Sequence, residues 1–255
     1  MTKSDAHFAG SFQDKTYWII GASEGLGRAV ANLLSRHGAK LVLSARSEDR
    51  LKSLVDELPG RASYQCIDVR DAESVAKASQ AIARDHGPID GMVFLAGVYW
   101  PMGAKDIDPE KLETMCDINF TGAARCLAHV VPEMVDRGAG HIVLTGSLSG
   151  FRGLPGAMGY GASKAGVMSL AEGLRADLKG TGVKVQLANP GFIKTRLTDK
   201  NDFKMPFLME PEQAARQMVE LMMGDAFARS FPTAFSYVFR GSRFLPNWLY
   251  YSLFR

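Results

Sequence analysis

The chain has 255 residues, of which 46% are hydrophobic, and this is enough apolar material for one buried α/β core in a single domain. No stretch approaches the roughly 18 apolar residues that span a bilayer, and residues 1–14 are polar and lack the apolar region of a signal peptide. Three cysteines without C-x-x-C spacing favour reduced thiols, and five scattered histidines favour no metal site. We therefore expect a cytoplasmic protein with a flexible lead-in over residues 1–14.

The first elements in chain order are a strand, a glycine-rich turn and a helix. Residues 16–20 are apolar enough for a buried strand, and residues 28–37 predict a helix that ends at Gly38. Between them, residues 21–27 have the pattern G-x-x-x-G-x-G. Glycines let a backbone approach a pyrophosphate, and a helix N-terminus supplies amide donors. This context favours a dinucleotide site over a turn that binds no ligand.

The second strand, residues 40–44, ends in Ala45-Arg46. Sites that select NAD place an acid near this point for the ribose 2′-hydroxyl, whereas an arginine suits the 2′-phosphate of NADP. Glu48 and Asp49 come later and fit the first turn of a helix capped by Ser47. We therefore predict that Arg46 binds the phosphate and that the cofactor is NADP, with NAD as the less favoured alternative.

Strands and helices alternate through the rest of the chain, which predicts a Rossmann-type, doubly wound parallel sheet. The expected strands are 62–67, 91–95, 141–145 and 183–188, and the expected helices are 72–84, 110–137 with a kink at Pro132, 157–179 and 211–223. Ser147 and the loop from Asn189 to Gly191 then follow strand ends, where such sheets bind ligands. Residues 191–210 lack periodicity and are expected to form a mobile lid over the substrate.

Tyr160 and Lys164 are four residues apart in the helix expected over 157–179, so they share one helix face. A neighbouring cation lowers the pKa of a phenol, which would let Tyr160 exchange a proton with a carbonyl or alcohol oxygen. Ser147 could donate a hydrogen bond to the same oxygen. Taken alone, the pair could equally be two surface residues.

In combination, these motifs resemble the single-domain short-chain dehydrogenase/reductases from Lys15 to the region of Gly224. The resemblance implies an oxidoreductase that transfers hydride between a nicotinamide and a ketone or secondary alcohol. It implies that Tyr160 is the acid/base, that Ser147 orients the substrate oxygen and that Lys164 holds the ribose and lowers the Tyr160 pKa. Asn119 would position a water that connects Lys164 to solvent.

The resemblance also implies the cofactor contacts. Asp68 and Val69 match a pair that contacts adenine, and the loop from Asn189 to Gly191 with Thr195 matches the segment at the nicotinamide. The expected contacts are Gly21, Ser23, Gly25, Leu26, Gly27, Arg46, Asp68, Val69, Ala96, Gly97, Tyr160, Lys164, Pro190, Gly191, Ile193 and Thr195.

Two positions depart from the family pattern: Ile20 replaces a threonine and Leu95 an asparagine. We expect altered local hydrogen bonding there, with catalysis retained. A nucleotide-sugar epimerase or dehydratase is an alternative, disfavoured by the glycine spacing and short chain. A cofactor-binding protein that acts by partner or membrane contact is another, disfavoured by the intact catalytic set.

Residues 226–255 follow the catalytic domain expected over 15–225 and form a basic, aromatic extension. They hold ten of the 24 aromatic residues, four arginines and no acid, so residues 1–225 carry a net charge of −1 within a total of +3. Short helices are expected at 233–240 and 247–254, after a last strand that ends at Phe231-Pro232. The extension either packs on the protein or a twin subunit, or rests on lipid at the cytosolic face; nucleic acid is not expected.

The substrate is expected to be a lipophilic small-molecule carbonyl or alcohol. This prediction rests on apolar residues near the catalytic elements, namely Met102, Phe151, Leu154, Met158 and Phe192. A homodimer or homotetramer is expected.

Overall fold

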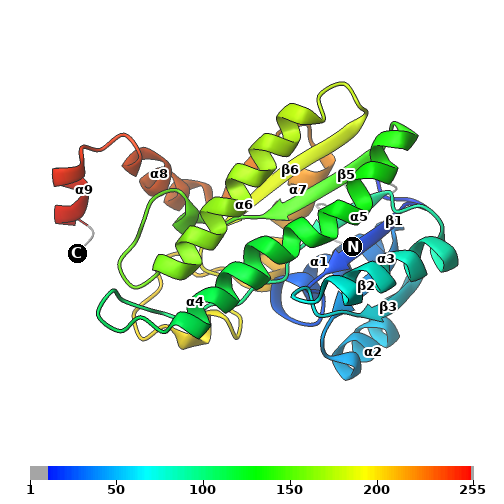
Figure 1. Ribbon diagram of the computed structural model, residues 1–255, viewed down its shortest axis with the longest axis horizontal. Coiled ribbons are helices and arrows are strands. Elements are labelled where there is room, and N and C mark those ends of the chain that lie inside the picture. Colours follow the sequence, from blue (N-terminus) through cyan, green and yellow to red (C-terminus); the bar gives the residue numbers. More distant parts are fainter. Residues whose placement is uncertain (1–10, 254–255) are drawn as a thin grey trace.

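The computed structural model describes residues 11–253, in which seven strands form one parallel sheet covered by helices on both faces (Figure 1). The sheet order is β3-β2-β1-β4-β5-β6-β7. The strands are β1 (Thr16–Ile20), β2 (Lys40–Ala45), β3 (Ala62–Cys66), β4 (Gly91–Phe94), β5 (Gly140–Thr145), β6 (Val183–Pro190) and β7 (Ala228–Phe231). This confirms the predicted Rossmann-type α/β fold.

Two hydrophobic cores lie on opposite faces of the sheet. One packs beneath α3 (Ala72–His86), α5 (Gly122–Arg137) and α6 (Met158–Asp177), and the other beneath α1 (Gly25–Arg36), α2 (Glu48–Glu57) and α7 (Pro211–Met223). In β1, Trp18 and Ile20 face the first core while Tyr17 and Ile19 face the second, because successive strand side chains point to opposite faces. Further helices are α4 (Pro109–Cys116), α8 (Thr233–Ser242) and α9 (Asn247–Leu253).

The prediction of a helix over 110–137 with a kink at Pro132 is wrong about where the helix is interrupted. The interruption lies at Asp117–Thr121, a π-helical turn in which the Gly122 N–H donates to the Asp117 carbonyl. The helix runs unbroken through Pro132. Pro132 is exposed, so water can satisfy the carbonyl that loses its helical partner.

Several boundaries shift by a few residues. Helix α1 begins at Gly25 and therefore includes part of the glycine turn. Ser47 occupies the cap position of α2, but its side chain makes no capping hydrogen bond. Phe12 is buried against Tyr17, so packed structure begins before Lys15, while the rest of the expected lead-in, residues 1–10, lies outside the described residues.

The C-terminal extension continues from β7 into α8 and α9, which stand beyond one end of the sheet (Figure 1). Both expected short helices are present, and residue 254 lies outside the described part. Within residues 11–253 no helix has both the length and the apolar character needed to cross a bilayer.

Candidate active site

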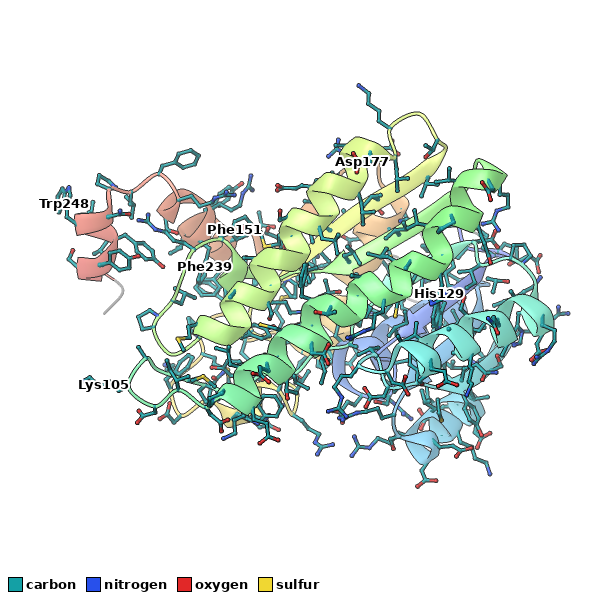
Figure 2. The ribbon with its side chains drawn as sticks, in the orientation of Figure 1. Lys105, His129, Phe151, Asp177, Phe239 and Trp248 are labelled. Atoms are coloured by element: carbon teal, nitrogen blue, oxygen red, sulfur yellow. The ribbon has the colours of Figure 1, made fainter. Side chains whose placement is uncertain are left out.

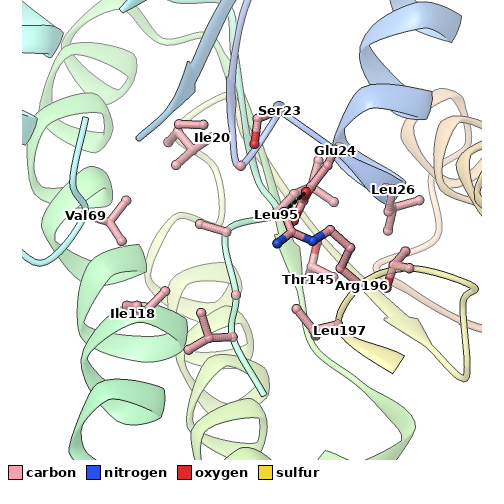
Figure 3. A pocket seen from close by; sticks show the side chains of 18 of the residues that line it. Ile20, Ser23, Glu24, Leu26, Val69, Leu95, Ile118, Thr145, Arg196 and Leu197 are labelled. Atoms are coloured by element: carbon pink, nitrogen blue, oxygen red, sulfur yellow. Dashed lines mark hydrogen bonds and ion pairs between the residues drawn. The ribbon is translucent and has the colours of Figure 1, made fainter. Parts of the chain in front are cut away.

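A pocket of about 810 Å³ opens at the carboxyl ends of the central strands (Figure 3). It lies where the chain order reverses between β1 and β4, the position at which doubly wound sheets bind ligands. All sixteen residues that the sequence analysis expects to contact the cofactor line this pocket. Two catalytic candidates, Tyr160 and Lys164, line this pocket, and Ser147 forms a hydrogen bond with Tyr160 without lining the pocket itself.

The glycine turn is packed so closely that side chains at its glycine positions would collide with neighbouring atoms. Gly21 and Gly25 have φ of +90° and +54°, values that favour glycine. A Cβ on Gly27 would lie 2.0 Å from the Gly21 carbonyl oxygen, and one on Gly25 would lie 2.8 Å from Thr195 Cγ2. The turn and the N-terminus of α1 therefore fit a pyrophosphate in close contact with the backbone.

Backbone hydrogen bonds brace the sheet at the two positions that depart from the family pattern. The Gly21 N–H donates to the Ser44 carbonyl at 2.7 Å, and the Leu95 N–H donates to the Ile20 carbonyl at 2.7 Å. Ile20 is fully buried. The ends of β1 and β4 are thus joined without a side-chain hydrogen bond from either residue.

Four arginines line the pocket, and carboxylates hold three of them. Glu24 accepts from Arg50 at 2.6 Å and from Arg196 at 3.1 Å (Figure 3 shows Glu24 beside Arg196), and Asp68 accepts from Arg70 at 2.6 Å. Arg46 is exposed and has no hydrogen bond or ion pair with any residue in 11–253. Its guanidinium is therefore available to an anionic ligand.

Tyr160 lies in the first turn of α6, and Lys164 lies one turn later on the same face. The Lys164 Nζ is 5.7 Å from the centre of the Tyr160 ring and donates to the Thr145 carbonyl at 2.9 Å. Tyr99 packs edge-on against Tyr160 with ring centres 5.1 Å apart. The phenol and the ammonium thus line the same part of the pocket.

The expected lowering of the Tyr160 pKa is wrong. Burial raises the pKa of Tyr160 to about 12, although the hydrogen bond with Ser147 opposes this shift. Burial also lowers the pKa of Lys164 to about 8. Because Lys164 directs its hydrogen bond to Thr145, desolvation dominates over any attraction between the two side chains.

Ser147 follows β5 and is buried at the N-cap of a short 3₁₀ turn. Its Oγ accepts hydrogen bonds from the Ser149 N–H at 3.2 Å and from the Ser149 hydroxyl at 2.9 Å. The proton on Ser147 Oγ remains available for a further acceptor. Its link to Tyr160 places both hydroxyls where one substrate oxygen could meet them.

Asn119 lies fully buried in the π-helical turn. Its Oδ1 accepts from the Val98 N–H at 2.8 Å, and its Nδ2 donates to the Val98 carbonyl at 3.0 Å and to Ser163 Oγ at 3.0 Å. The side chain therefore braces the loop after β4. These contacts occupy its amide, and the expected link through water to Lys164 remains a prediction.

The lid segment, residues 191–210, closes one side of the pocket. A bridge between Ile193 and Met209 joins its two ends, and Lys200 donates to the Tyr99 carbonyl at 2.7 Å while its ammonium lies over the Trp100 ring. The Arg196–Glu24 ion pair ties the segment to the glycine turn. The segment thus borders both the cofactor residues and the loop that carries Tyr99.

Some pocket residues escaped the sequence analysis. Arg70 and Arg196 directly follow predicted positions and Arg50 lies four residues after Arg46, but only the fold brings them to one pocket. Thr145 lines the pocket with a buried Oγ1 that lacks a hydrogen-bond partner within residues 11–253. Ser163 falls between Tyr160 and Lys164, and nothing in the sequence marks it as the partner of Asn119.

Comparisons with known proteins show the family of this chain. The family model described as short chain dehydrogenase matches residues 15–205, and the chain belongs to this family. It is an NAD(P)-dependent dehydrogenase/reductase, as the sequence analysis predicted.

Relatives cover most of the chain. An uncharacterized oxidoreductase of Myxococcus xanthus is 40% identical over 92% of this chain and 94% of its own. A dehydrogenase/reductase SDR family member 7B of Danio rerio is 31% identical over 74% of this chain and 64% of its own. Among solved structures, a short-chain dehydrogenase from Sphingobium yanoikuyae in complex with NADPH has a TM-score of 0.80 and 27% identity, covering 89% of this chain and 91% of that one.

Proposed function

We propose that this protein is an NADP-dependent reductase of lipophilic ketones. When bound in the pocket, the nicotinamide would exchange hydride with the substrate carbon. Tyr160 would exchange the proton with the substrate oxygen, Ser147 would donate a hydrogen bond to that oxygen, and Lys164 would hold the ribose. The observation that carries this proposal is that Tyr160 lies in a dinucleotide-sized pocket beside Lys164 and in hydrogen-bond contact with Ser147.

The preference for NADP is supported by the state of Arg46. Arg50 and Arg70 line the same pocket, but each is neutralised by a carboxylate. Arg46 forms no ion pair or hydrogen bond within residues 11–253, although its charge helps to lower the pKa of Asp68, and it follows β2, where a 2′-phosphate is recognised.

The direction of reduction is supported by the protonation of Tyr160. A phenol whose pKa is about 12 keeps its proton at neutral pH, so Tyr160 is ready to donate it to a carbonyl oxygen. Abstraction of an alcohol proton would first require that the phenol lose its own. The protonated phenol is the form of Tyr160 that carbonyl reduction uses.

A lipophilic substrate is supported by aromatic residues on the lid side of Tyr160. Tyr99 contacts Tyr160 directly, and Phe192 in the lid packs against Phe203 at 5.8 Å. Four of the five apolar residues expected near the substrate are partly exposed, whereas Met102 is buried in a bridge with Ala157. None of the five lines the pocket described above.

A substrate panel tests the proposal. Ketones of increasing chain length and the matching secondary alcohols would be followed at the nicotinamide absorbance with NADPH, NADH and their oxidised forms. We expect kcat/KM to be highest with NADPH and to rise with ketone chain length. Equal rates with NADH would contradict the cofactor preference, and a preference for the shortest ketones would contradict the substrate class.

A further inference from the structure

The C-terminal extension exposes large apolar side chains at the end of the molecule. Phe244 is 89% exposed and Trp248 is 74% exposed, which is unusual for side chains of this size. The exposed large hydrophobic residues of α8, α9 and their linker are Tyr237, Val238, Phe244, Trp248, Tyr251 and Leu253. We call these six residues, with Arg240 and Arg243, the α8–α9 surface.

This surface is presented on a fixed support. Arg152, in the loop between Ser147 and Tyr160, donates to the carbonyls of Ser242 and Leu245 and to Asn247 Oδ1. Its guanidinium also lies 3.9 Å from the centre of the Tyr250 ring, and Tyr250 is buried. Because one side of the extension is held to the body, its exposed aromatics point outward; Figure 2 shows Trp248 on the outer side of α9.

The charges of the extension have one sign. Arg240 and Arg243 are both exposed, and neither forms an ion pair with a described residue. Residues 226–255 contain no aspartate or glutamate. Pairing this surface with its own copy would therefore bring like charges together, whereas an anionic surface would neutralise them.

The residue types also match one environment. Tryptophan and tyrosine favour the boundary between hydrocarbon and water, and arginine can reach headgroups while its stem stays apolar. Exposed aromatics beside arginines, on short helices that cannot span a bilayer, are typical of segments that lie in the membrane interface. From these observations we propose that the α8–α9 surface docks on a bilayer that contains anionic lipids.

Docking would occur next to the active site. Phe235 of α8 packs against Phe207 at 5.2 Å and Phe192 at 6.1 Å, and both belong to the lid segment. Phe239 completes this contact from the buried side of α8. The docked face and the lid are thus joined by aromatic contacts. The docking proposal itself does not depend on the chemistry assigned to Tyr160.

Vesicle sedimentation with the full-length chain tests the proposal. One set of vesicles would hold phosphatidylcholine alone and the other phosphatidylcholine with phosphatidylserine, each at low and at high salt. We expect binding to the anionic vesicles only, and weaker binding at high salt because charges are screened over about 10 Å at 0.1 M. Arg240→Gln with Arg243→Gln should weaken binding about thirty-fold, at roughly 1 kcal/mol for each cation near an anionic surface.

Matched variants separate docking from unspecific effects. Phe244→Ser with Trp248→Ser should abolish sedimentation, while Val135→Ser on α5 should not change it. Arg36→Gln with Lys52→Gln removes the same amount of positive charge from α1 and α2. This control should retain most of the wild-type binding to anionic vesicles. Thermal unfolding and size-exclusion chromatography of each variant would show that the fold persists.

Three results would overturn the proposal. The first is wild-type protein that sediments with neither kind of vesicle. The second is an Arg36/Lys52 control that loses as much vesicle binding as the Arg240/Arg243 variant. Phe244→Ser with Trp248→Ser that converts an oligomer to a smaller species would show that a second copy covers this surface. Each of these readouts needs no turnover, so failure of the proposed reductase activity would be seen separately.

Discussion

The Nζ of Lys164 lies 5.7 Å from the centre of the Tyr160 ring and donates its hydrogen bond to the Thr145 carbonyl. The two side chains thus share a site without a direct hydrogen bond between them. Desolvation favours the neutral form of each side chain. It raises the pKa of Tyr160 to about 12 and lowers the pKa of Lys164 to about 8. A phenol protonated at neutral pH beside a lysine is the arrangement that the proposed carbonyl reduction needs.

Arg46→Ala should weaken NADPH binding by about 1.5–3 kcal/mol, roughly 10- to 150-fold in Kd, because it removes a charge-assisted contact. NADH affinity should change little. Arg70→Ala is the matched control, since Asp68 already holds that guanidinium. Dissociation constants for both cofactors would be measured by nicotinamide fluorescence. An equal loss for NADPH and NADH would mean that Arg46 does not recognise the 2′-phosphate.

His141 should make the protein less stable in mild acid. Gln186 donates to three backbone carbonyls, so its Oε1 accepts from His141 Nε2–H, and Nδ1 accepts from the Tyr17 hydroxyl. Burial lowers the pKa of His141 to about 4, with Lys184 and Lys15 adding to the shift and Gln186 opposing it.

Since an unfolded histidine has a pKa near 6.5, the unfolded state binds more protons between pH 6.5 and 4, and stability falls as pH falls through that range. The loss from pH 7.5 to 5 should be about 2 kcal/mol from this residue. Urea unfolding at both pH values would measure it, with His141→Asn expected to reduce the pH dependence and the exposed His86→Asn to leave it intact. A wild-type stability that does not decrease over this range would refute the assignment.

Arg152→Ala should release the C-terminal extension from the loop between Ser147 and Tyr160. It removes hydrogen bonds to two carbonyls and to Asn247. We expect a loss of about 1–3 kcal/mol in the free energy of unfolding, the range for hydrogen bonds to a charged group. Limited proteolysis should then cut between α8 and α9 earlier than in wild type. Unchanged cleavage and stability would show that the clamp contributes little.

Asn119→Ala should destabilise the loop after β4. It leaves the partly buried Val98 N–H and carbonyl without their side-chain partner, at a cost of about 1–3 kcal/mol. The half-buried Asn32→Ala, which removes a single bond to the Arg28 carbonyl, is the matched control and should cost less. Urea unfolding would compare them, and equal costs would argue against a bracing role for Asn119.

The sheet and the pocket could be predicted because they follow from local patterns. Apolar strands that alternate with helices require a parallel sheet, and parallel strands place Ser147 and Pro190 at the same edge. The glycine turn is equally local, because Gly25 has a positive φ, which glycine adopts more readily than other residues do.

The π-helical turn at Asp117–Thr121 could not be predicted, because the choice between hydrogen bonds to i−4 and i−5 depends on how Asn119 meets Val98. The pKa of Tyr160 was mispredicted for a related reason. Spacing shows that Lys164 is near, but only the fold shows how far the phenol is desolvated. In the extension, composition could not separate the buried Tyr250 from the exposed Trp248.

The most direct test of the central claim compares wild type with Tyr160→Phe on the best ketone from the substrate panel. The variant keeps the ring that packs on Tyr99 and loses only the hydroxyl that donates the proton. We predict that kcat falls about 10²–10⁴-fold, the usual contribution of a general acid, while the Kd for NADPH stays unchanged. A Tyr160→Phe enzyme that turns over at close to the wild-type rate would contradict the assigned mechanism.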